Sequence, residues 1–321
     1  MYKRKKIAVV VPAYNEERLI GKVIETIPDY IDYIVVVDDA SSDDTLTTLE
    51  KHRKELGEKM LIIKHEKNEG VGASIASGYV WCRDQGVDVA VVMAGDAQMD
   101  PKDLPNLLKP IVENKADYSK GNRLFTGDAW QKIPKIRYLG NSMLSLLTKI
   151  ASGYWQVADS QCGYTAINKK ALGKIDWDGM HKCYGQPNDL LVRLNIENMR
   201  VYDVEVEPVY GIGEKSGIKP LFIIPKMFLL LSRLFMYRMV HKYVIRDFHP
   251  LIFFYSLGGI FFLSSLFLSV RMFWLWYIQG AIPPTTLILN VFSMMSMFQF
   301  TLFAMWFDME NNRHLSNSQK L

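Results

Sequence analysis

The chain has 321 residues, a formal net charge of +4 and a mean hydropathy of zero. This average conceals two parts, because residues before about 215 have the mixed composition of a water-soluble domain, whereas the rest is basic and then strongly apolar. The basic residues of the second part are interleaved with Leu, Phe and Met, which argues against nucleic-acid binding. The three cysteines are widely spaced and form no metal-binding pattern, so we expect reduced, buried thiols.

Apolar runs and helical repeats alternate in the first part of the chain. Strands are predicted at 7–11, 33–37, 60–64 and 87–93, and helices at 16–27, 45–56 and 73–83. Continuous Val and Ile runs that alternate with helices are typical of a parallel sheet covered on both faces. Ligands bind such sheets at the carboxyl ends of the strands, so we expect a functional site in the turns that follow them.

Four of these turns are rich in polar residues or glycine. They are PAYNEE at 12–17, DDASSDDT at 38–45, NEGVGA at 68–73 and GDAQMDP at 95–101. Each turn alone could be ordinary helix capping or turn chemistry. Together, at one edge of a sheet, their carboxylates can bind sugar hydroxyls and a hard divalent cation. The sequence contains neither the dinucleotide motif GxGxxG nor the P-loop motif GxxxxGK[ST].

A basic segment and two uncharged runs follow. The segment 215–246 contains no Asp or Glu, and its residues 226–243 are predicted to form an interfacial helix whose cations, Arg238 and Lys242 among them, face an anionic lipid surface. A soluble core helix is the alternative.

The runs 251–270 and 282–307 are each long enough to span a bilayer. They contain no embedded acid or buried basic pair, and so they lack the usual marker of a transporter. The basic flanks place both ends of the hairpin in the cytoplasm.

The motifs resemble those of family 2 glycosyltransferases with the GT-A fold, and among them dolichol-phosphate mannose synthase and related polyprenyl-phosphate sugar synthases. Besides the four turns, the resemblance rests on GNR at 121–123, DSQCGYTA at 159–166 and GEKSG at 213–217. It implies a mostly parallel α/β sheet with helices on both faces. It further implies a membrane-bound, inverting transfer of one sugar from GDP-mannose or a UDP-hexose to a polyprenyl or dolichyl phosphate.

With the apolar runs, the resemblance also implies a division of the chain. The expected parts are a cytosolic catalytic domain at 1–217, interfacial helices at 218–248, two spans within 249–308 (about 251–273 and 284–307) and a cytosolic tail at 309–321. The expected partners are a nucleotide sugar, a polyprenyl phosphate and the lipid bilayer. Gly258 and Gly259 would permit association of spans, so a homo-oligomer stays open.

The resemblance assigns roles to individual residues. Asp159 would lie beside the acceptor phosphate and the anomeric carbon, and Asp96 would be the second catalytic residue, holding Mg²⁺ or Mn²⁺ together with Gln98. The nucleotide sugar would be bound by Pro12, Tyr14, Glu16, Asp39, Asn68 and Gly70, and phosphate by Arg123, Arg137 and Lys215. Members of the family often have Asp-x-Asp in the fourth turn, whereas this chain has Ala94 at the first position. The identity of the metal therefore stays open.

Three functions are weighed. A transferase of single sugars is favoured, because a processive polysaccharide synthase usually has a QxxRW motif and more spans, which this sequence lacks. A membrane scaffold with weak catalysis is the third function, and Ala94 is the best argument for it.

An acceptor phosphate, whose second pKa is about 6, is already anionic near neutral pH. Asp159 is therefore expected to position groups or stabilise charge rather than to accept a proton, unless it only caps a turn.

Overall fold

The computed structural model describes residues 2–124, 135–207, 209 and 220–316. The chain divides into two compact units, which we call the sheet unit (Met1–Phe235 with His314–Leu321) and the hairpin unit (Met236–Arg313). The division falls within one helix, α9, whose bounds are Pro220–Val240.

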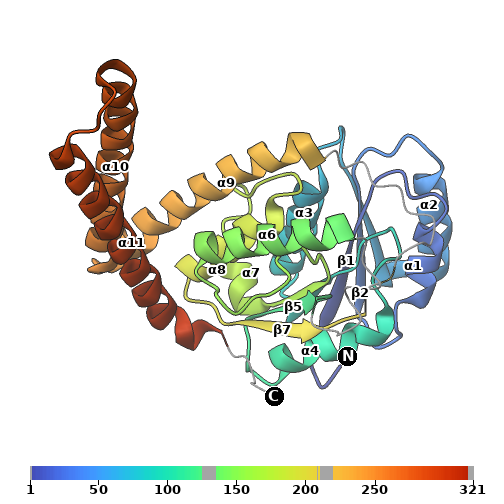
Figure 1. The fold of residues 1–321 in the computed structure, drawn as a ribbon. Helices are drawn as coiled ribbons and strands as arrows, with labels where there is room; N and C mark the ends of the chain where they lie inside the picture. Colours follow the sequence, from blue (N-terminus) through green and yellow to red (C-terminus); the bar gives the residue numbers. More distant parts are fainter. Residues whose placement is uncertain (1, 125–134, 208, 210–219, 317–321) are drawn as a thin grey trace. The chain divides into compact units, whose positions relative to one another are not determined.

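The sheet unit is built on seven described strands in the order β3-β2-β1-β4-β6-β5-β7 (Figure 1). Their bounds are β1 Ile7–Ala13, β2 Tyr33–Asp38, β3 Met60–Lys64, β4 Val89–Val92, β5 Tyr118–Asn122, β6 Thr165–Asn168 and β7 Val201–Glu205. β6 runs antiparallel to β4 and β5, and the other neighbouring strands are parallel. The turns after β1, β2, β4 and β5 and the loop before β6 therefore share one edge of the sheet.

Helices cover both faces of this sheet. They are α1 Ile20–Thr26, α2 Thr45–Leu56, α3 Val71–Asp84, α4 Leu104–Val112, α6 Lys135–Ser152, α7 Lys169–Lys174 and α8 Gln186–Ile196, with short 3-10 turns η1 Gly57–Lys59 and η2 Pro101–Asp103. Residues of α1, α2 and α4 pack with Val9 and Val11 of β1, and residues of α3, α7 and α8 pack with Ala8 and Val10. Alternate side chains of β1 thus enter opposite cores, which explains why the strand is apolar throughout.

The predicted strands and helices of the first part are all present, and the largest displacement of a boundary is at the start of α1. α1 begins at Ile20 rather than at Glu16, because Glu16 belongs to a turn in which its carbonyl oxygen accepts hydrogen bonds from the N–H groups of Leu19 and Ile20. The expectation of buried cysteines holds for Cys82 and Cys162. It is wrong for Cys183, which is exposed in the loop that precedes α8.

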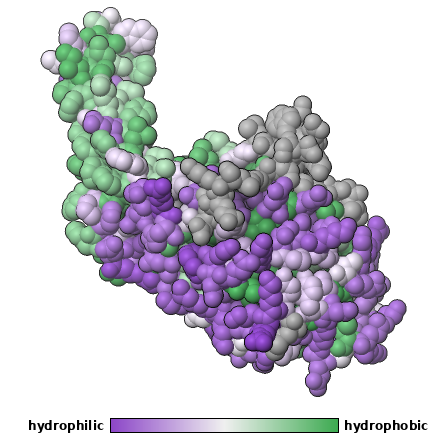
Figure 2. Space-filling view, turned by 90° about the horizontal axis from the view of Figure 1, so that it is seen from below, coloured by the Kyte–Doolittle hydropathy of each residue, from purple (hydrophilic) through white to green (hydrophobic). Residues whose placement is uncertain are grey.

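The hairpin unit consists of the end of α9, the π-helix η3 (His241–Arg246), α10 (Leu251–Gln279), α11 (Pro284–Asn312) and the start of the 3-10 turn η4 (Arg313–Leu315). Among the described residues, α10 and α11 are long and apolar enough to cross a membrane, and their most apolar windows have mean hydropathies of 2.1 and 1.6. Hydrophobic residues cover most of the surface of the hairpin unit in Figure 2, whereas the face of the sheet unit in that view is mainly hydrophilic. The uncharged runs thus form two helices as expected.

Two basic residues that were expected to face lipid are buried instead. The guanidinium of Arg238 donates to both carboxylate oxygens of Asp308, at 2.8 and 2.9 Å, and both side chains are fully buried. Tyr243 donates to Asp308 Oδ1 at 2.6 Å, and Lys242 Nζ donates to Asn312 Oδ1 at 2.7 Å. α11 continues past the uncharged run and includes Asp308, so the buried acid lies one position beyond the segment 282–307 that was expected to lack one.

Candidate functional site

The turns after β1 and β2 are joined by hydrogen bonds. Asn15 N–H donates to Ser41 Oγ at 3.0 Å, and Asn15 Oδ1 accepts from Ser42 N–H at 2.8 Å. Glu16 N–H donates at 2.8 Å to the hydroxyl of Thr45, the first residue of α2. The first two motifs therefore form one structural element at the edge of the sheet.

Asp39 attaches the third motif to the second. Its carboxylate accepts from the backbone N–H groups of Glu69 at 2.9 Å and Gly70 at 2.8 Å, and it contacts His65 Nδ1 at 2.7 Å. Gly70 has a φ of +97°, and a Cβ at this position would lie 2.6 Å from the carbonyl oxygen of Lys182. The position therefore requires glycine. Asp39 and Gly70 lie in the predicted region, where they hold the turn before α3.

The turn after β4 lies against the turn after β1. Gly95 N–H donates to the carbonyl oxygen of Pro12 at 3.1 Å, and a Cβ on Gly95 would lie 3.5 Å from Glu16 Cγ. Burial, followed by the negative charges of Asp96 and Asp43, raises the pKa of Glu16 to about 7. The edge of the sheet thus concentrates negative charge, which is typical of sites that bind cations.

The residues of the fourth motif fit a divalent cation that is completed by substrate phosphates. Asp96 supplies a carboxylate and Gln98 an amide oxygen, and both are hard oxygen ligands. Asp96 Oδ1 also accepts from Gln98 N–H at 3.1 Å, which closes the turn, whereas Asp100 caps η2 through Lys102 N–H at 2.9 Å. Among the described residues, no three His, Cys, Asp or Glu side chains form a cluster that could hold a metal ion alone.

Three of the motif turns contain a non-glycine residue with a left-handed backbone. The φ angles are +55° at Asn15, +60° at Ala40 and +57° at Ala97. Asparagine adopts this conformation readily, but for other residues it costs about 1–2 kcal/mol. Strain of this kind is retained mainly where the surrounding structure and a ligand require it. Its occurrence at Ala40 and Ala97, in two turns at one edge, supports a binding site there.

Asp159 and Arg123 form an ion pair in the loop before β6 and after β5. Arg123 Nε donates to Asp159 Oδ2 at 2.7 Å, and a second guanidinium N–H donates to Oδ1 at 3.2 Å. Asp159 is fully buried and Arg123 is 21% exposed. Burial alone would raise the pKa of Asp159, but Arg123 and Lys120 outweigh it and hold this pKa below its ordinary value. Asp159 is therefore an ionised carboxylate in a fixed position.

The loop that contains Asp159 also contacts the fourth motif. The hydroxyl of Tyr164 donates to the carbonyl oxygen of Asp100 at 3.1 Å. The two regions expected to contact the metal and the acceptor are thus joined directly.

Two buried ionisable side chains behind this ion pair were missed by the sequence analysis. Lys120 on β5 is fully buried, and its Nζ donates to the backbone carbonyl oxygen of Cys162. Asp203 on β7 accepts from Ala158 N–H at 2.8 Å and from Asn122 Nδ2 at 3.1 Å, so it holds the residues that precede both members of the pair. Neither residue has a sequence signal, because a charged residue in a short strand is usually exposed.

The other predicted site residues are brought to this edge to different degrees. Pro12 is buried in β1, whereas Tyr14 is 48% exposed and Asn68 is exposed in the turn that Asp39 holds. Arg137 lies on α6, at a position whose side chain the structure does not describe, and Lys215 lies outside the described residues. The roles of these residues stay predictions.

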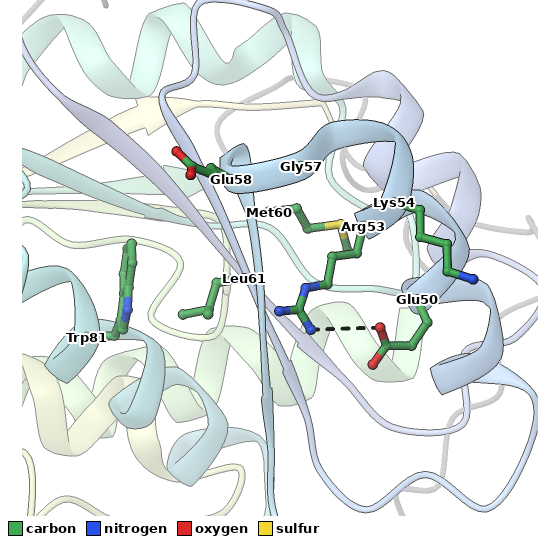
Figure 3. Close-up of a pocket in the computed structure, with 8 residues that line it drawn as sticks. All are labelled: Glu50, Arg53, Lys54, Gly57, Glu58, Met60, Leu61 and Trp81. Carbon is green, nitrogen blue, oxygen red and sulfur yellow. Dashed lines mark ion pairs between the residues drawn. The ribbon is translucent and has the colours of Figure 1, made fainter.

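Figure 3 shows a pocket at a different place in the sheet unit. It is lined by residues of α2, η1, β3 and α3, namely Glu50, Arg53, Lys54, Gly57, Glu58, Met60, Leu61 and Trp81. Met60 and Leu61 begin β3, which runs parallel to β2. The pocket therefore lies toward the edge opposite the motif turns, and none of the predicted site residues lines it.

Comparison with known proteins assigns the chain to a family. The model of the family described as Glycosyl transferase family 2 matches residues 8–176. UDP-N-acetylglucosamine–dolichyl-phosphate N-acetylglucosaminyltransferase of Methanococcus voltae is 30% identical over 222 residues, which are 64% of this chain and 86% of that protein. Undecaprenyl-phosphate mannosyltransferase of Micrococcus luteus is 29% identical over 220 residues, 66% of this chain and 88% of that protein.

The fold also resembles solved structures. Glucosyl-3-phosphoglycerate synthase from Mycobacterium tuberculosis, in complex with Mn²⁺, UDP and glucosyl-3-phosphoglycerate, matches with a TM-score of 0.52 and 20% identity, over 73% of this chain and 80% of that one. This likeness confirms the expected GT-A fold. Because the family model spans more than half of the sequence, the chain belongs to glycosyl transferase family 2.

Proposed function

We propose that the protein transfers one sugar from a nucleotide sugar to a polyprenyl phosphate. The observation that carries this proposal is the match to two relatives that are named as transferases acting on dolichyl phosphate and undecaprenyl phosphate, over 86% and 88% of their lengths. The helices α10 and α11 agree with such an acceptor, because they would hold a water-soluble catalytic domain at a bilayer.

The reaction proposed is a direct displacement. An oxygen of the acceptor phosphate attacks the anomeric carbon while the bond from that carbon to the nucleoside diphosphate breaks, and the leaving diphosphate takes the electron pair. The configuration of the anomeric carbon is thereby inverted. The acceptor is anionic near neutral pH, so no strong base is required. Asp159, held ionised by Arg123, suits a group that orients the reactants and stabilises developing positive charge.

A divalent cation, Mg²⁺ or Mn²⁺, is part of the proposal. Asp96 and Gln98 would hold it, and it would neutralise charge on the leaving diphosphate. A cation that is also bound by substrate phosphates needs only one or two protein carboxylates, so Ala94 at the position of a frequent family Asp is compatible with activity. Pro12, Tyr14, Glu16, Asp39, Asn68 and Gly70 are proposed to surround the nucleotide sugar.

The proposed topology has two spans and a cytoplasmic catalytic domain. Lys226, Arg233 and Arg246 are exposed cations of the segment that precedes α10, and they favour the cytoplasmic side. A chain that ends near Lys219 should leave the membrane fraction during a high-salt wash but still bind nucleotide, since the proposed nucleotide turns precede residue 101. Retention of the shortened chain in the membrane pellet would show that α10 and α11 are not the anchor.

The function is tested with the purified full-length protein in liposomes that contain undecaprenyl or dolichyl phosphate. Radiolabelled UDP-N-acetylglucosamine, UDP-glucose and GDP-mannose are supplied in turn, and lipid products are separated by chromatography. We expect one donor to give a lipid that carries a single sugar. A long polymer would indicate a processive synthase, and no product from any of the donors would favour a scaffold. Asp100→Asn is a matched control for Asp96→Asn, because Asp100 caps η2 in the same turn.

A further inference from the structure

Gln161 lies in the loop before β6, and its side-chain amide is held between two oxygen atoms. Nε2 donates to Ser160 Oγ at 2.7 Å and to Asn188 Oδ1 at 2.9 Å. Asn188 is itself fully buried, and its Oδ1 also accepts from the hydroxyl of Thr148 at 3.0 Å. The backbone N–H of Ser160 donates to Ser145 Oγ at 3.1 Å, and this hydrogen bond fixes the position of Ser160. These contacts hold the amide of Gln161 in place, while Nδ2 of Asn188 is buried without a hydrogen-bond partner in the described structure.

In this arrangement the oxygen of the amide accepts no hydrogen bond from the described residues, and Gln161 lies two positions after Asp159. The backbone N–H of Gln161 donates to Asp159 Oδ1 at 3.2 Å, so the residue is adjacent to the fixed carboxylate. Both N–H groups of the side chain are used, while within the described part of the chain Oε1 accepts no hydrogen bond and is not among the buried polar atoms. Gln161 as a whole is half-buried. Its Oε1 is thus an acceptor whose position is set before a ligand binds.

We propose that Oε1 of Gln161 accepts a hydrogen bond from a hydroxyl or amide N–H of the transferred sugar and thereby helps to select that sugar. This inference rests on the nucleotide-sugar donor of the proposed function. Hexoses differ in the orientation of their hydroxyl groups, and a site that holds a rigid partner for one of them rejects analogues that lack it. Asn188 acts through Gln161 and is a positioning residue, because it touches the amide and not the ligand.

The test measures binding of donors to the full-length protein in detergent with Mg²⁺. The probes are UDP-N-acetylglucosamine, UDP-glucose and GDP-mannose, the matching UDP or GDP, and deoxy analogues of whichever nucleotide sugar binds most tightly. In the wild type, we expect one deoxy analogue to bind on the order of 10-fold more weakly than its parent, the loss typical of one hydrogen bond. In Gln161→Ala the parent should lose that factor, and the same analogue should lose nothing further.

Two controls separate selection from a structural role. Gln161→Ala should bind UDP or GDP as the wild type does, since the nucleotide turns are unchanged. Ser119→Ala removes a buried serine hydroxyl that donates to the carbonyl oxygen of Leu107 and has no part in holding Gln161, so it should leave the preference among analogues intact. A ratio of affinities is insensitive to the fraction of folded protein, so partial unfolding of a variant would not imitate the expected result.

The inference is overturned if Gln161→Ala leaves every parent-to-analogue affinity ratio unchanged. It is also overturned if the variant weakens the binding of UDP or GDP as much as that of the nucleotide sugar. A third contrary result would be that no nucleotide sugar of the panel binds the wild type better than its nucleoside diphosphate. Donor binding requires no lipid acceptor. Selection through Gln161 without transfer to polyprenyl phosphate would therefore reject the proposed function and retain the inference. Transfer of sugar to polyprenyl phosphate with unchanged parent-to-analogue affinity ratios would support the proposed function and reject the inference.

Discussion

Replacing Asp203 by asparagine tests the charge arrangement behind the Asp159–Arg123 pair. Burial raises the pKa of Asp203 from its ordinary value of 3.8 to about 7. The hydrogen bond from Ala158 N–H and the positive charges of Lys120 and Lys149 oppose this rise, while the charge of Asp159 adds to it. One carboxylate oxygen of Asp203, Oδ1, is buried without a hydrogen-bond partner in the described structure. The neutral form of the side chain is therefore favoured in the folded protein.

The sign and size of the effect follow from proton linkage. Between about pH 4 and pH 7 the folded protein binds one proton more than the unfolded chain does, so the stability contributed by this site falls as pH rises through that window. A rise of the pKa from 3.8 to about 7, at about 1.36 kcal/mol per pH unit, corresponds to a loss of about 4 kcal/mol above pH 7. Asparagine resembles the protonated acid and does not ionise. Asp203→Asn should thus match the wild type near pH 4 and exceed its free energy of unfolding by up to about 4 kcal/mol at pH 8.

The assay is reversible chemical unfolding of the full-length protein in detergent at pH 4.5, 6 and 8. Asp178→Asn is the matched control, because Asp178 is an exposed carboxylate of the same unit. It should change the free energy of unfolding by a similar small amount at each pH. A difference between Asp203→Asn and wild type that is constant with pH, or that is larger at pH 4.5 than at pH 8, would refute the reasoning.

Three further predictions concern the metal, the buried ion pair and the acceptor. Asp96→Ala should lower turnover at least about 100-fold, since metal stabilisation is worth several kcal/mol; full activity in excess EDTA would contradict this. Arg238→Met or Asp308→Leu alone should lower the free energy of unfolding in detergent by about 3–5 kcal/mol, and the double variant should recover most of this loss. Additive losses in the double variant would contradict a coupled pair. Arg137→Ala or Lys215→Ala should lower acceptor efficiency on the order of 10- to 100-fold, with donor affinity measured as the control; no loss would make these surface charges.

The sheet could be predicted from the sequence where one local signal dominates. β1 is apolar throughout, and β2 is apolar as far as Val37, because both faces of these strands are buried. No other common element gives short runs of Val and Ile with helices between them. The start of α1 was misplaced because Glu16 satisfies helical spacing yet takes part in a turn held by Thr45. Contacts with another motif decided that boundary, and they are not visible in a local pattern.

The turns of the site were predictable, but the pairing of its charges was not. Arg123 and Asp159 are 36 positions apart, and Arg238 and Asp308 are 70 positions apart. In both cases a cation that was expected to bind phosphate or lipid pairs with a buried carboxylate from a distant part of the sequence. Gln161 gave no signal of its own, because its fixed orientation depends on Asn188, which follows it by 27 positions.

The pairing of Arg123 with Asp159 changes what must bind the acceptor. A guanidinium that donates two hydrogen bonds to a buried carboxylate already neutralises that charge, and withdrawing it would leave Asp159 buried and unpaired, at a cost of about 3–5 kcal/mol. A lipid phosphate that bound mainly through Arg123 would have to offset this cost, because its own negative charge would compete with Asp159. Positive charge from elsewhere is therefore required, and Arg137 and Lys215 are the other cations that the resemblance assigns to phosphate binding. Charge-neutralising changes at these two positions should consequently weaken use of the acceptor, whereas Arg123→Ala should also weaken the stability of the fold. A loss of acceptor efficiency in Arg123→Ala with unchanged stability would show that Arg123 binds the phosphate after all.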